Sequence, residues 1–458
     1  MAETASETDP RAFAWQALLR VEAGDFADAV VGDGLGHTRL GPRDRGLATR
    51  LVYGTIAWQA HLDHLLSAFC NRPLRQLDPA VRVVLRLALF QVTRLDRIPP
   101  FAAVDTAVEL CKQRDRRAAG FVNAVLRKAV RGWRDVPLPD ARRDPVGHAA
   151  VALSHPRWLV QRWFDELGAA DATRLLEANN DVAPTVVRVQ LAQGSRADLI
   201  DLWQAAGTTA EPTAHAPGGL RLEGAAHTGL PGWTDGRFAF QGEASQLVAP
   251  LLGLRPGDRV LDLCAAPGGK ALHAAEILGG TGELVAVDIA AAGIDRLRRE
   301  AQRLRLDGIR AEVADATVWG PPADTPLFDA VLLDAPCTGL GTLRAHPEIR
   351  WRRQLADVRR NSVLQRRLLQ RAAALTRPGG VVVYATCTLS AEENEQVVDA
   401  VCPEAALRVD SVAPYLPAAA AGLADSRGFL RTWPHRDGLD GFFAARLLRH
   451  EGASTVAP

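Results

Sequence analysis

The pattern of apolar and polar positions in the first third of the chain is typical of amphipathic helices. Apolar side chains return every three or four positions over residues 13–21 and again over residues 81–92. Glycine and proline interrupt this pattern between helical stretches, for example at Pro99-Pro100. The pattern therefore predicts an all-α domain over residues 1–140. We interpret the Pro-, Asp- and Arg-rich stretch 132–147 as the linker that follows it.

A different pattern begins near residue 150. Short helical and extended stretches alternate there, and we expect them at residues 158–178, 185–189, 196–206, 220–222 and 237–240. The stretch Thr185–Val189 has the clearest β character, because β-branched residues dominate it and Pro184 precedes it. Together these elements predict a small α+β domain over residues 150–240.

The last part of the chain, residues 241–450, alternates short strands with helices. Apolar runs predict strands at residues 259–263, 284–287, 330–333 and 381–384. A long helix at residues 353–375 is expected between the last two strands. Repeated β-α-β units of this kind indicate an α/β domain of Rossmann-like type with a parallel doubly wound sheet. Ligands of such domains bind at the carboxyl ends of the strands.

The composition is that of an ordinary globular protein, with 47% hydrophobic and 23% charged residues. No apolar run is long enough to span a membrane, and the polar stretch Met1–Pro10 does not resemble a signal peptide. We therefore expect a cytoplasmic protein with no membrane partner. The six cysteines show no C-x-x-C spacing, so we expect neither a disulfide framework nor a metal site.

The distribution of charge is more informative than the net charge of +1. Basic residues clearly outnumber acidic ones between Arg11 and Arg134, and arginine is abundant again between Thr342 and Arg371. Such stretches can bind the phosphates of a nucleic acid, but the solvated helix faces of an arginine-rich protein would give the same pattern. Lysine is rare in this chain, and Lys270 is notable because it lies in a glycine-rich turn.

That turn follows the first predicted strand of the last domain. It belongs to the string Asp262–Lys270, whose small residues let the backbone approach a ligand and whose following helix offers amide donors. Asp288 ends the next strand, where a carboxylate can accept both hydroxyls of a ribose. Asp315 follows the strand after that, in a position to contact an adenine ring. Single aspartates of this kind are more often helix caps, but their order behind the turn favours a nucleoside-containing cofactor.

Two cysteines each follow an apolar strand. Cys337 comes soon after Asp334, and Cys387 lies in the string Tyr384–Thr388. The carboxyl ends of parallel strands share one edge of a sheet, so we expect both thiols and the carboxyl group to lie close together. A thiolate that adds to carbon 6 of cytosine makes carbon 5 nucleophilic toward a sulfonium methyl group. A carboxyl group near N3 would favour the addition, and a second thiol would assist the later elimination.

Three strings in the last domain resemble the signatures of the RNA cytosine-C5 methyltransferases, which include bacterial Fmu/RsmB-type and eukaryotic NOL/NOP/Sun-type enzymes. They are CAAPGGK (264–270), DAPCTGLG (334–341) and ATCTLSAEEN (385–394). Three further strings are similar to the NusB-like domain of the small-subunit ribosomal RNA methyltransferase B group, namely LVYGT (51–55), RIPP (97–100) and VNAVLR (122–127). The resemblance implies a NusB-like all-α domain, a small RRM-like α+β domain and a class I methyltransferase domain, in that order.

The resemblance also implies a role for each matching residue. Cys387 would be the nucleophile, Cys337 would assist product release, and Asp334 would contact both the surroundings of the methyl donor and the target base. Lys270 would belong to the same network. The residues implied to bind S-adenosylmethionine are Cys264, Ala265, Ala266, Pro267, Gly268, Gly269, Lys270, Asp288, Asp315 and Asp334. The implied partner is RNA, specifically the 16S RNA of the small ribosomal subunit, and we expect a monomer.

Three alternatives remain open at the level of the sequence. A non-catalytic NusB-like RNA-binding or antitermination factor would be expected to have lost Cys387 or Asp334, and both are present. An amino-group methyltransferase would carry an aromatic side chain in the turn where Cys337 stands. The same cytosine chemistry on transfer RNA or large-subunit ribosomal RNA is chemically equivalent, so only the N-terminal resemblance favours the small subunit.

Overall fold

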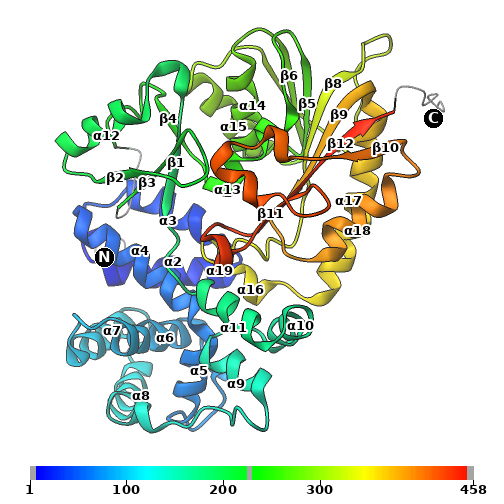
Figure 1. Ribbon diagram of the computed structural model, residues 1–458. Coiled ribbons are helices and arrows are strands. Elements are labelled where there is room, and N and C mark those ends of the chain that lie inside the picture. Colours follow the sequence, from blue (N-terminus) through cyan, green and yellow to red (C-terminus); the bar gives the residue numbers. More distant parts are fainter. Residues whose placement is uncertain (1–6, 224–228, 451–458) are drawn as a thin grey trace. The chain divides into compact units, whose positions relative to one another are not determined.

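The computed structural model describes residues 7–223 and 229–450 (Figure 1). The chain forms two compact units. The first consists of Met1–Val182 and Leu343–Arg352, and the second of Ala183–Thr342 and Arg353–Pro458. Among the described residues, no helix is both long and apolar enough to cross a membrane.

The first unit is helical, as the spacing of apolar residues predicts. Its helices are α2 (Pro10–Ala23), α3 (Ala27–Gly36), α4 (Pro42–Ala57), α5 (Gln59–Ser67), α6 (Pro79–Arg94), α7 (Pro100–Arg114), α8 (Ala118–Gly132), α9 (Pro145–Ala152), α10 (Arg157–Leu167), α11 (Ala169–Ala178) and α16 (Ile349–Arg352). Capping residues define several starts: Asp78 accepts a hydrogen bond from the amide of Ala80 at the beginning of α6. The apolar faces of α2 to α8 meet in one core, in which Leu85 is fully buried.

The segment Leu343–Arg352 belongs to the first unit although it comes from much later in the sequence. Arg350 is fully buried, and its guanidinium donates to the carbonyl oxygens of Ser154 at 3.1 Å and Asn179 at 2.8 Å. The indole of Trp351 donates to a carbonyl oxygen in the last turn of α4 at 2.7 Å. The sequence left two interpretations open for this arginine-rich stretch, a phosphate-binding patch and a solvated helix face. Arg350 fits neither, because it is fully buried.

The second unit contains a small antiparallel sheet. Its strands are β1 (Thr185–Val189), β2 (Ala210–Pro212), β3 (Gly219–Leu222) and β4 (Phe238–Phe240), in the order β2-β3-β1-β4. Helix α12 (Arg196–Ala205) packs against this sheet through Trp203, whose ring centroid lies 5.1 Å from that of Phe238. The predicted strands and the helix predicted at residues 196–206 are therefore present, and the short strand β2 was not predicted. The single helix predicted at residues 158–178 is instead two helices, α10 and α11, which are separated at Gly168 and belong to the first unit.

The large sheet of the second unit is mixed. Its strands are β5 (Arg259–Leu263), β6 (Glu283–Asp288), β7 (Ile309–Val313), β8 (Phe328–Asp334), β9 (Thr376–Thr386), β10 (Leu407–Asp410), β11 (Leu430–Thr432) and β12 (Phe442–Arg449). The order is β10-β12-β9-β8-β5-β6-β7, with β11 paired to β12. The sequence predicted a parallel sheet, but β12 is antiparallel to β9, β10 and β11. Too few residues separate β11 from β12 for the crossover helix that a parallel pair requires.

Helices cover both faces of the large sheet (Figure 1). The helices of the second unit besides α12 are α13 (Glu243–Gln246), α14 (Gly269–Leu278), α15 (Ala291–Arg303), α17 (Leu355–Leu375), α18 (Glu395–Val401) and α19 (Pro434–Asp437). Successive residues of a strand point to opposite faces, so Val260 packs into the core that contains α14, whereas Leu261 packs into the core that contains α17 and α18. The loops that follow the parallel strands are thereby brought to one edge of the sheet.

Candidate active site

The loop after β5 turns back against β6. The amides of Cys264 and Ala265 both donate to the carbonyl oxygen of Val287, at 2.8 and 3.0 Å. Gly268 then adopts a φ of 113° immediately before α14 begins. A side chain at Gly268 would lie 3.0 Å from Leu297 and would also require a left-handed backbone. Both facts explain why glycine occupies this position.

Two of the predicted cofactor-binding aspartates lie at the ends of the neighbouring strands. Asp288, at the end of β6, accepts hydrogen bonds from the amides of Ala266 at 3.0 Å and Ala290 at 2.8 Å, so its carboxylate lies directly beside the loop. Asp315, just after β7, is exposed and accepts from the hydroxyl and the amide of Thr317 at 2.7 and 2.8 Å. Both hydrogen bonds lower the pKa of Asp315, and the one from the hydroxyl has the larger effect.

Asp262 is a further candidate for the site to which the sequence assigned no role. Its side chain is 1% exposed, and neither carboxyl oxygen has a hydrogen-bond partner within the described part of the chain. Burial, reinforced by the charge of Asp334, raises the pKa of Asp262 well above its usual value. A buried carboxyl group without partners is costly unless a ligand supplies them. Asp262 begins the glycine-rich string 262–270, and this position is the sequence signal that could have included it in the site.

The two thiols that were expected to lie together do so. Cys337 follows β8 and Cys387 follows β9, and their Sγ atoms are 3.4 Å apart. The amide of Gly341 donates to the carbonyl oxygen of Cys387 at 3.0 Å, which joins the two loops. The hydrogen bond with Cys387, together with burial, raises the pKa of Cys337 well above its ordinary value. Cys337 is therefore a neutral thiol at physiological pH.

Lys270, in the first turn of α14, reaches the end of β8. Its Nζ atom lies 2.5 Å from Oδ2 of Asp334. Burial favours the neutral form of Lys270, but the charge of Asp334 and the hydrogen bond with it outweigh this effect, and the pKa of Lys270 is raised. The site therefore combines a fixed cation, a carboxylate and two thiols, all of which the sequence had proposed as catalytic.

The remaining cysteines have environments that suppress the thiolate. Burial is the main cause that raises the pKa of Cys264, and the surrounding carboxylates add to it. Burial also raises the pKa of Cys70, Cys111 and Cys402. A thiol is a weak nucleophile unless it ionises, so these four residues are poor candidates for covalent chemistry.

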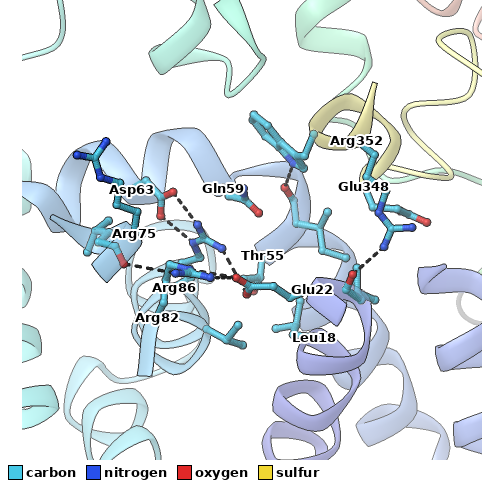
Figure 2. Close-up of a pocket in the computed structure, with 15 residues that line it drawn as sticks. Leu18, Glu22, Thr55, Gln59, Asp63, Arg75, Arg82, Arg86, Glu348 and Arg352 are labelled. Carbon is cyan, nitrogen blue, oxygen red and sulfur yellow. Dashed lines mark hydrogen bonds and ion pairs between the residues drawn. The ribbon is translucent and has the colours of Figure 1, made fainter. Parts of the chain in front are cut away.

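The first unit contains a pocket lined by arginine and acidic side chains (Figure 2). Arg86 forms an ion pair with Asp63 at 2.7 Å, and Arg82 pairs with Glu22. The guanidinium groups of Arg82 and Arg86 are therefore neutralised within the pocket.

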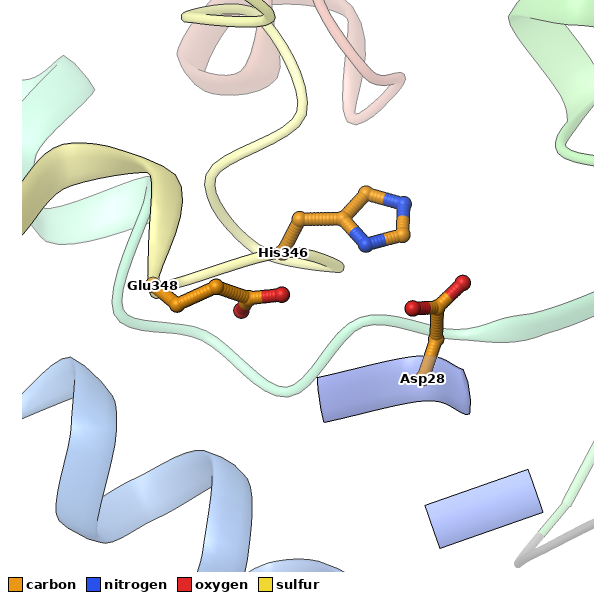
Figure 3. Close-up of side chains that lie close together, drawn as sticks. All are labelled: Asp28, His346 and Glu348. Atoms are coloured by element: carbon orange, nitrogen blue, oxygen red, sulfur yellow. The ribbon is translucent and has the colours of Figure 1, made fainter. Parts of the chain in front are cut away.

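Three potential metal ligands, Asp28, His346 and Glu348, point toward one another in the first unit (Figure 3). Their ligand atoms lie within 4.8 Å of one another. One oxygen of Glu348 accepts a hydrogen bond from the amide of Ala27 at 3.0 Å and so caps α3. Its other oxygen has no hydrogen-bond partner among the described residues. The sequence had not indicated this group, because its members lie far apart along the chain.

Comparison with protein families finds matches along most of the chain. The model of the 16S rRNA methyltransferase RsmB/F family matches residues 249–448. The NusB family model matches residues 8–131, and the ferredoxin-like domain of RsmF/B-like methyltransferases matches residues 155–228. These matches confirm the resemblance that the short strings had indicated, including the order of the three domain types.

Individual relatives are similar over nearly their whole length. Ribosomal RNA small subunit methyltransferase B of Pseudomonas putida is 35% identical over 415 residues, which cover 90% of this chain and 92% of that protein. The protein of the same name from Xylella fastidiosa is 36% identical over 411 residues, 89% of this chain and 92% of its own.

Solved structures share the fold. The crystal structure of PH0851 has a TM-score of 0.83 at 25% identity and covers 96% of this chain and 98% of that one. The structure of NSun6 from Pyrococcus horikoshii with SFG has a TM-score of 0.58 at 22% identity, covers 65% of this chain and 99% of that one, and supports the fold alone. Identity of this extent to the Pseudomonas and Xylella proteins shows that the chain belongs to the RsmB/F family of S-adenosylmethionine-dependent methyltransferases.

Proposed function

We propose that this protein methylates carbon 5 of a cytosine in 16S ribosomal RNA of the small subunit. The observation that carries the proposal is the pair of thiols, Cys337 and Cys387, whose Sγ atoms are 3.4 Å apart near the ion pair of Lys270 and Asp334. Methylation of an amino group needs no thiol, because nitrogen is already nucleophilic. Methylation of a pyrimidine carbon requires a nucleophile to activate the ring and a base to release the product.

The proposed cofactor site consists of residues 264–270 with Asp288, Asp315 and Asp334. Asp288 is oriented by two backbone amides, which leaves other lone pairs of its carboxylate for ribose hydroxyls. The unpartnered carboxyl group of Asp262 adds a buried polar group at the same strand ends and fits a polar ligand. When S-adenosylmethionine is bound, it supplies an electrophilic methyl group.

Cys387 acts as the nucleophile in this proposal. Its sulfur forms a bond to carbon 6 of the cytosine, and the electrons of the ring double bond make carbon 5 nucleophilic toward the methyl group. Asp334, which Lys270 contacts at the end of β8, is assigned the role of donor: its protonated form donates a hydrogen bond to N3 and so stabilises the negative charge that the addition places on the ring. The cytosine must leave its base stack to reach a thiol at a strand end.

The raised pKa of Cys337 supports a separate role in product release. Cys387 is the first cause of that increase, through a hydrogen bond and through its charge as a thiolate. When Cys387 becomes a thioether, its negative charge is lost, and Cys337 can ionise more readily. The Cys337 thiolate then takes the proton from carbon 5, the ring double bond forms again, and the carbon–sulfur bond breaks to release Cys387 as a thiolate.

Ribosomal RNA is proposed as the substrate because relatives that cover most of the chain carry the name of small-subunit methyltransferase B. The match of residues 8–131 to the NusB family supports an RNA-binding first unit. A non-catalytic RNA-binding factor is a weaker proposal, because all four proposed catalytic side chains are present and adjacent. We further propose that the protein is cytoplasmic and monomeric. Light scattering of the purified protein would test the monomer, and fractionation of cells would test the location.

The test uses protein-free 16S RNA, S-adenosylmethionine and a denaturing gel. We expect Cys337→Ala to remain covalently attached to RNA, and the double variant with Cys387→Ala to form no such adduct. Normal turnover by Cys387→Ala alone would exclude the proposed nucleophile. If adduct and methylation occur only with transfer RNA, the chemistry stands and the proposed substrate is wrong.

A further inference from the structure

Glu393 is a buried carboxylate close to both thiol loops, and the proposed chemistry gives it no role. It is the last residue of a short 3-10 turn after β9 and is fully buried. No arginine or lysine among the described residues forms an ion pair with it. Burial, the largest influence, raises the pKa of Glu393, although several hydrogen bonds oppose that effect. A buried acidic group is expensive to retain without a positive partner, which suggests a specific function.

The hydrogen bonds of Glu393 reach the residue that follows each catalytic cysteine. One carboxylate oxygen accepts from the amide of Thr338 at 2.8 Å, and the other accepts from the hydroxyl of Thr338 at 2.5 Å. The second oxygen also accepts from the hydroxyl of Thr388 at 3.3 Å. Thr338 follows Cys337, and Thr388 follows Cys387. The two threonine hydroxyls are themselves 2.8 Å apart, so a single carboxylate closes a network between the two loops.

Helix α17 supports this network from the side. The amide groups of Gln365 and Asn361 donate to the first oxygen of Glu393 at 3.2 and 3.3 Å. Gln365 also donates to the carbonyl oxygen of Pro336 at 2.9 Å, directly before Cys337. The carboxylate therefore has fixed donors on the helix as well as on both loops, and it is held in one orientation.

The backbone around Glu393 is also tied to the strand that carries Cys387. The hydroxyl of Tyr384 donates to the carbonyl oxygen of Glu393 at 2.5 Å. The next residue, Asn394, accepts from the hydroxyl of Thr386 at 2.5 Å and donates to the carbonyl oxygen of Thr388 at 3.0 Å. Residues on both sides of Cys387 are thus attached to the turn that presents the carboxylate.

We propose that Glu393 is a positioning residue that holds the Cys337 loop against the Cys387 loop, so that the base for product release stays beside the covalent adduct. This inference rests on the proposed function. Glu393 touches neither sulfur by a hydrogen bond, and it acts through Thr338 and Thr388. Without it, Cys387 remains at the end of β9 and can still add to the base, whereas Cys337 loses its fixed distance from the adduct.

The test compares Glu393→Ala with Glu393→Gln. The alanine variant removes all the acceptors. The glutamine variant keeps the oxygen that accepts from the amide of Thr338 and replaces the second oxygen by a donor that can bind threonine hydroxyls. Glu404→Gln is the matched control, because Glu404 is exposed and accepts only from Gln370 among the hydrogen bonds of the described residues. Thermal melting of each variant separates loss of position from loss of folding.

Two readouts distinguish the inference from the proposed function. Dibromobimane becomes fluorescent when it links two nearby thiols, so it measures the spacing of Cys337 and Cys387 without RNA; Cys337→Ala gives the background. We expect Glu393→Ala to slow this linkage, and to lower kcat on the order of 10- to 100-fold with accumulation of the RNA adduct and little change in KM. Glu393→Gln should restore most of both values.

The inference is overturned if Glu393→Ala links its thiols and releases product at the rates of the Glu404→Gln control. It is also overturned if both Glu393 variants lose activity only in proportion to their loss of folded protein. If Cys337→Ala forms no RNA adduct at all, the proposed chemistry fails, while the rate of thiol linkage still decides whether Glu393 sets the spacing.

Discussion

Replacement of Arg350 by methionine should strongly destabilise the first unit. The guanidinium makes three short hydrogen bonds, to the carbonyl oxygens of Ser154 at 3.1 Å and Asn179 at 2.8 Å and to the side chain of Asn180 at 2.7 Å. Hydrogen bonds from a charged donor contribute about 1.5–3 kcal/mol each. Burial lowers the pKa of Arg350 to about 9, so the folded state also bears a cost for this charge.

The hydrogen bonds of Arg350 stabilise the folded state, whereas the burial of its charge destabilises it. Methionine removes both contributions. It fills part of the space but leaves three buried acceptors without a donor. An acceptor left without its donor typically costs about 1–3 kcal/mol, and removal of the buried charge offsets part of the sum over three acceptors, so we expect Arg350→Met to cost about 3–5 kcal/mol. Arg360→Met is the control, because the Arg360 side chain is 71% exposed and its ion pair with Asp357 should contribute less than about 1 kcal/mol.

Hydrogen exchange followed by mass spectrometry measures this cost within the first unit. A loss of about 3–5 kcal/mol corresponds to a decrease of roughly 10²- to 10⁴-fold in amide protection when opening is global. The decrease should appear in peptides from α4 and from residues 150–156, which face the guanidinium. A cost for Arg350→Met no larger than that for Arg360→Met would refute the reasoning, because it would show that the buried contacts contribute nothing net.

Other predictions concern the thiols and the cofactor loop. Mild peroxide should oxidise Cys337 and Cys387 to a disulfide, with reduction of peroxide to water and reversible loss of methylation. A treated protein that shows no Cys337–Cys387 cross-linked peptide in mass spectrometry would contradict this. Cys387→Ala should lower the pKa of Cys337, because the hydrogen bond with Cys387 is the main cause of the raised pKa. Alkylation of Cys337 should therefore begin at a lower pH in this variant than in the parent protein. Gly268→Ala should weaken S-adenosylmethionine binding in calorimetry by about 1–3 kcal/mol, because φ is 113° there and Leu297 is 3.0 Å from the new methyl group. Unchanged affinity would show that the loop tolerates a different backbone.

The sequence predicted that the proposed catalytic side chains lie close together, because their placement depends on a simple geometric rule. Lys270, Asp334, Cys337 and Cys387 each follow or adjoin an apolar strand, and parallel strands bring such positions to one edge. The rule says nothing about the direction of the outer strands of the sheet. The strands β10 and β12 are antiparallel, and their direction depends on a long-range pairing that no local pattern contains.

The sequence could not reveal the role of Glu393 or of Arg350 for a related reason. Glu393 stood in one of the strings that carried the family resemblance, yet its burial depends on Thr338 and Gln365, which come from two other parts of the chain. Arg350 lay in a stretch rich in arginine, and arginine is almost always exposed. In both cases the partners that make a buried charge tolerable are distant in sequence, so residue type alone favours the wrong environment.

The insertion of Leu343–Arg352 into the first unit affects how the protein is made. A ribosome synthesises α2 to α11 long before this segment, so the carbonyl groups of Ser154 and Asn179 lack their donor until Arg350 emerges. The strands β5 to β8 have by then also been synthesised. The first unit therefore completes its folding only when much of the large sheet exists. A chain released early would lack a finished first unit, to which we assign RNA binding, and would be less able to occupy RNA that it cannot methylate.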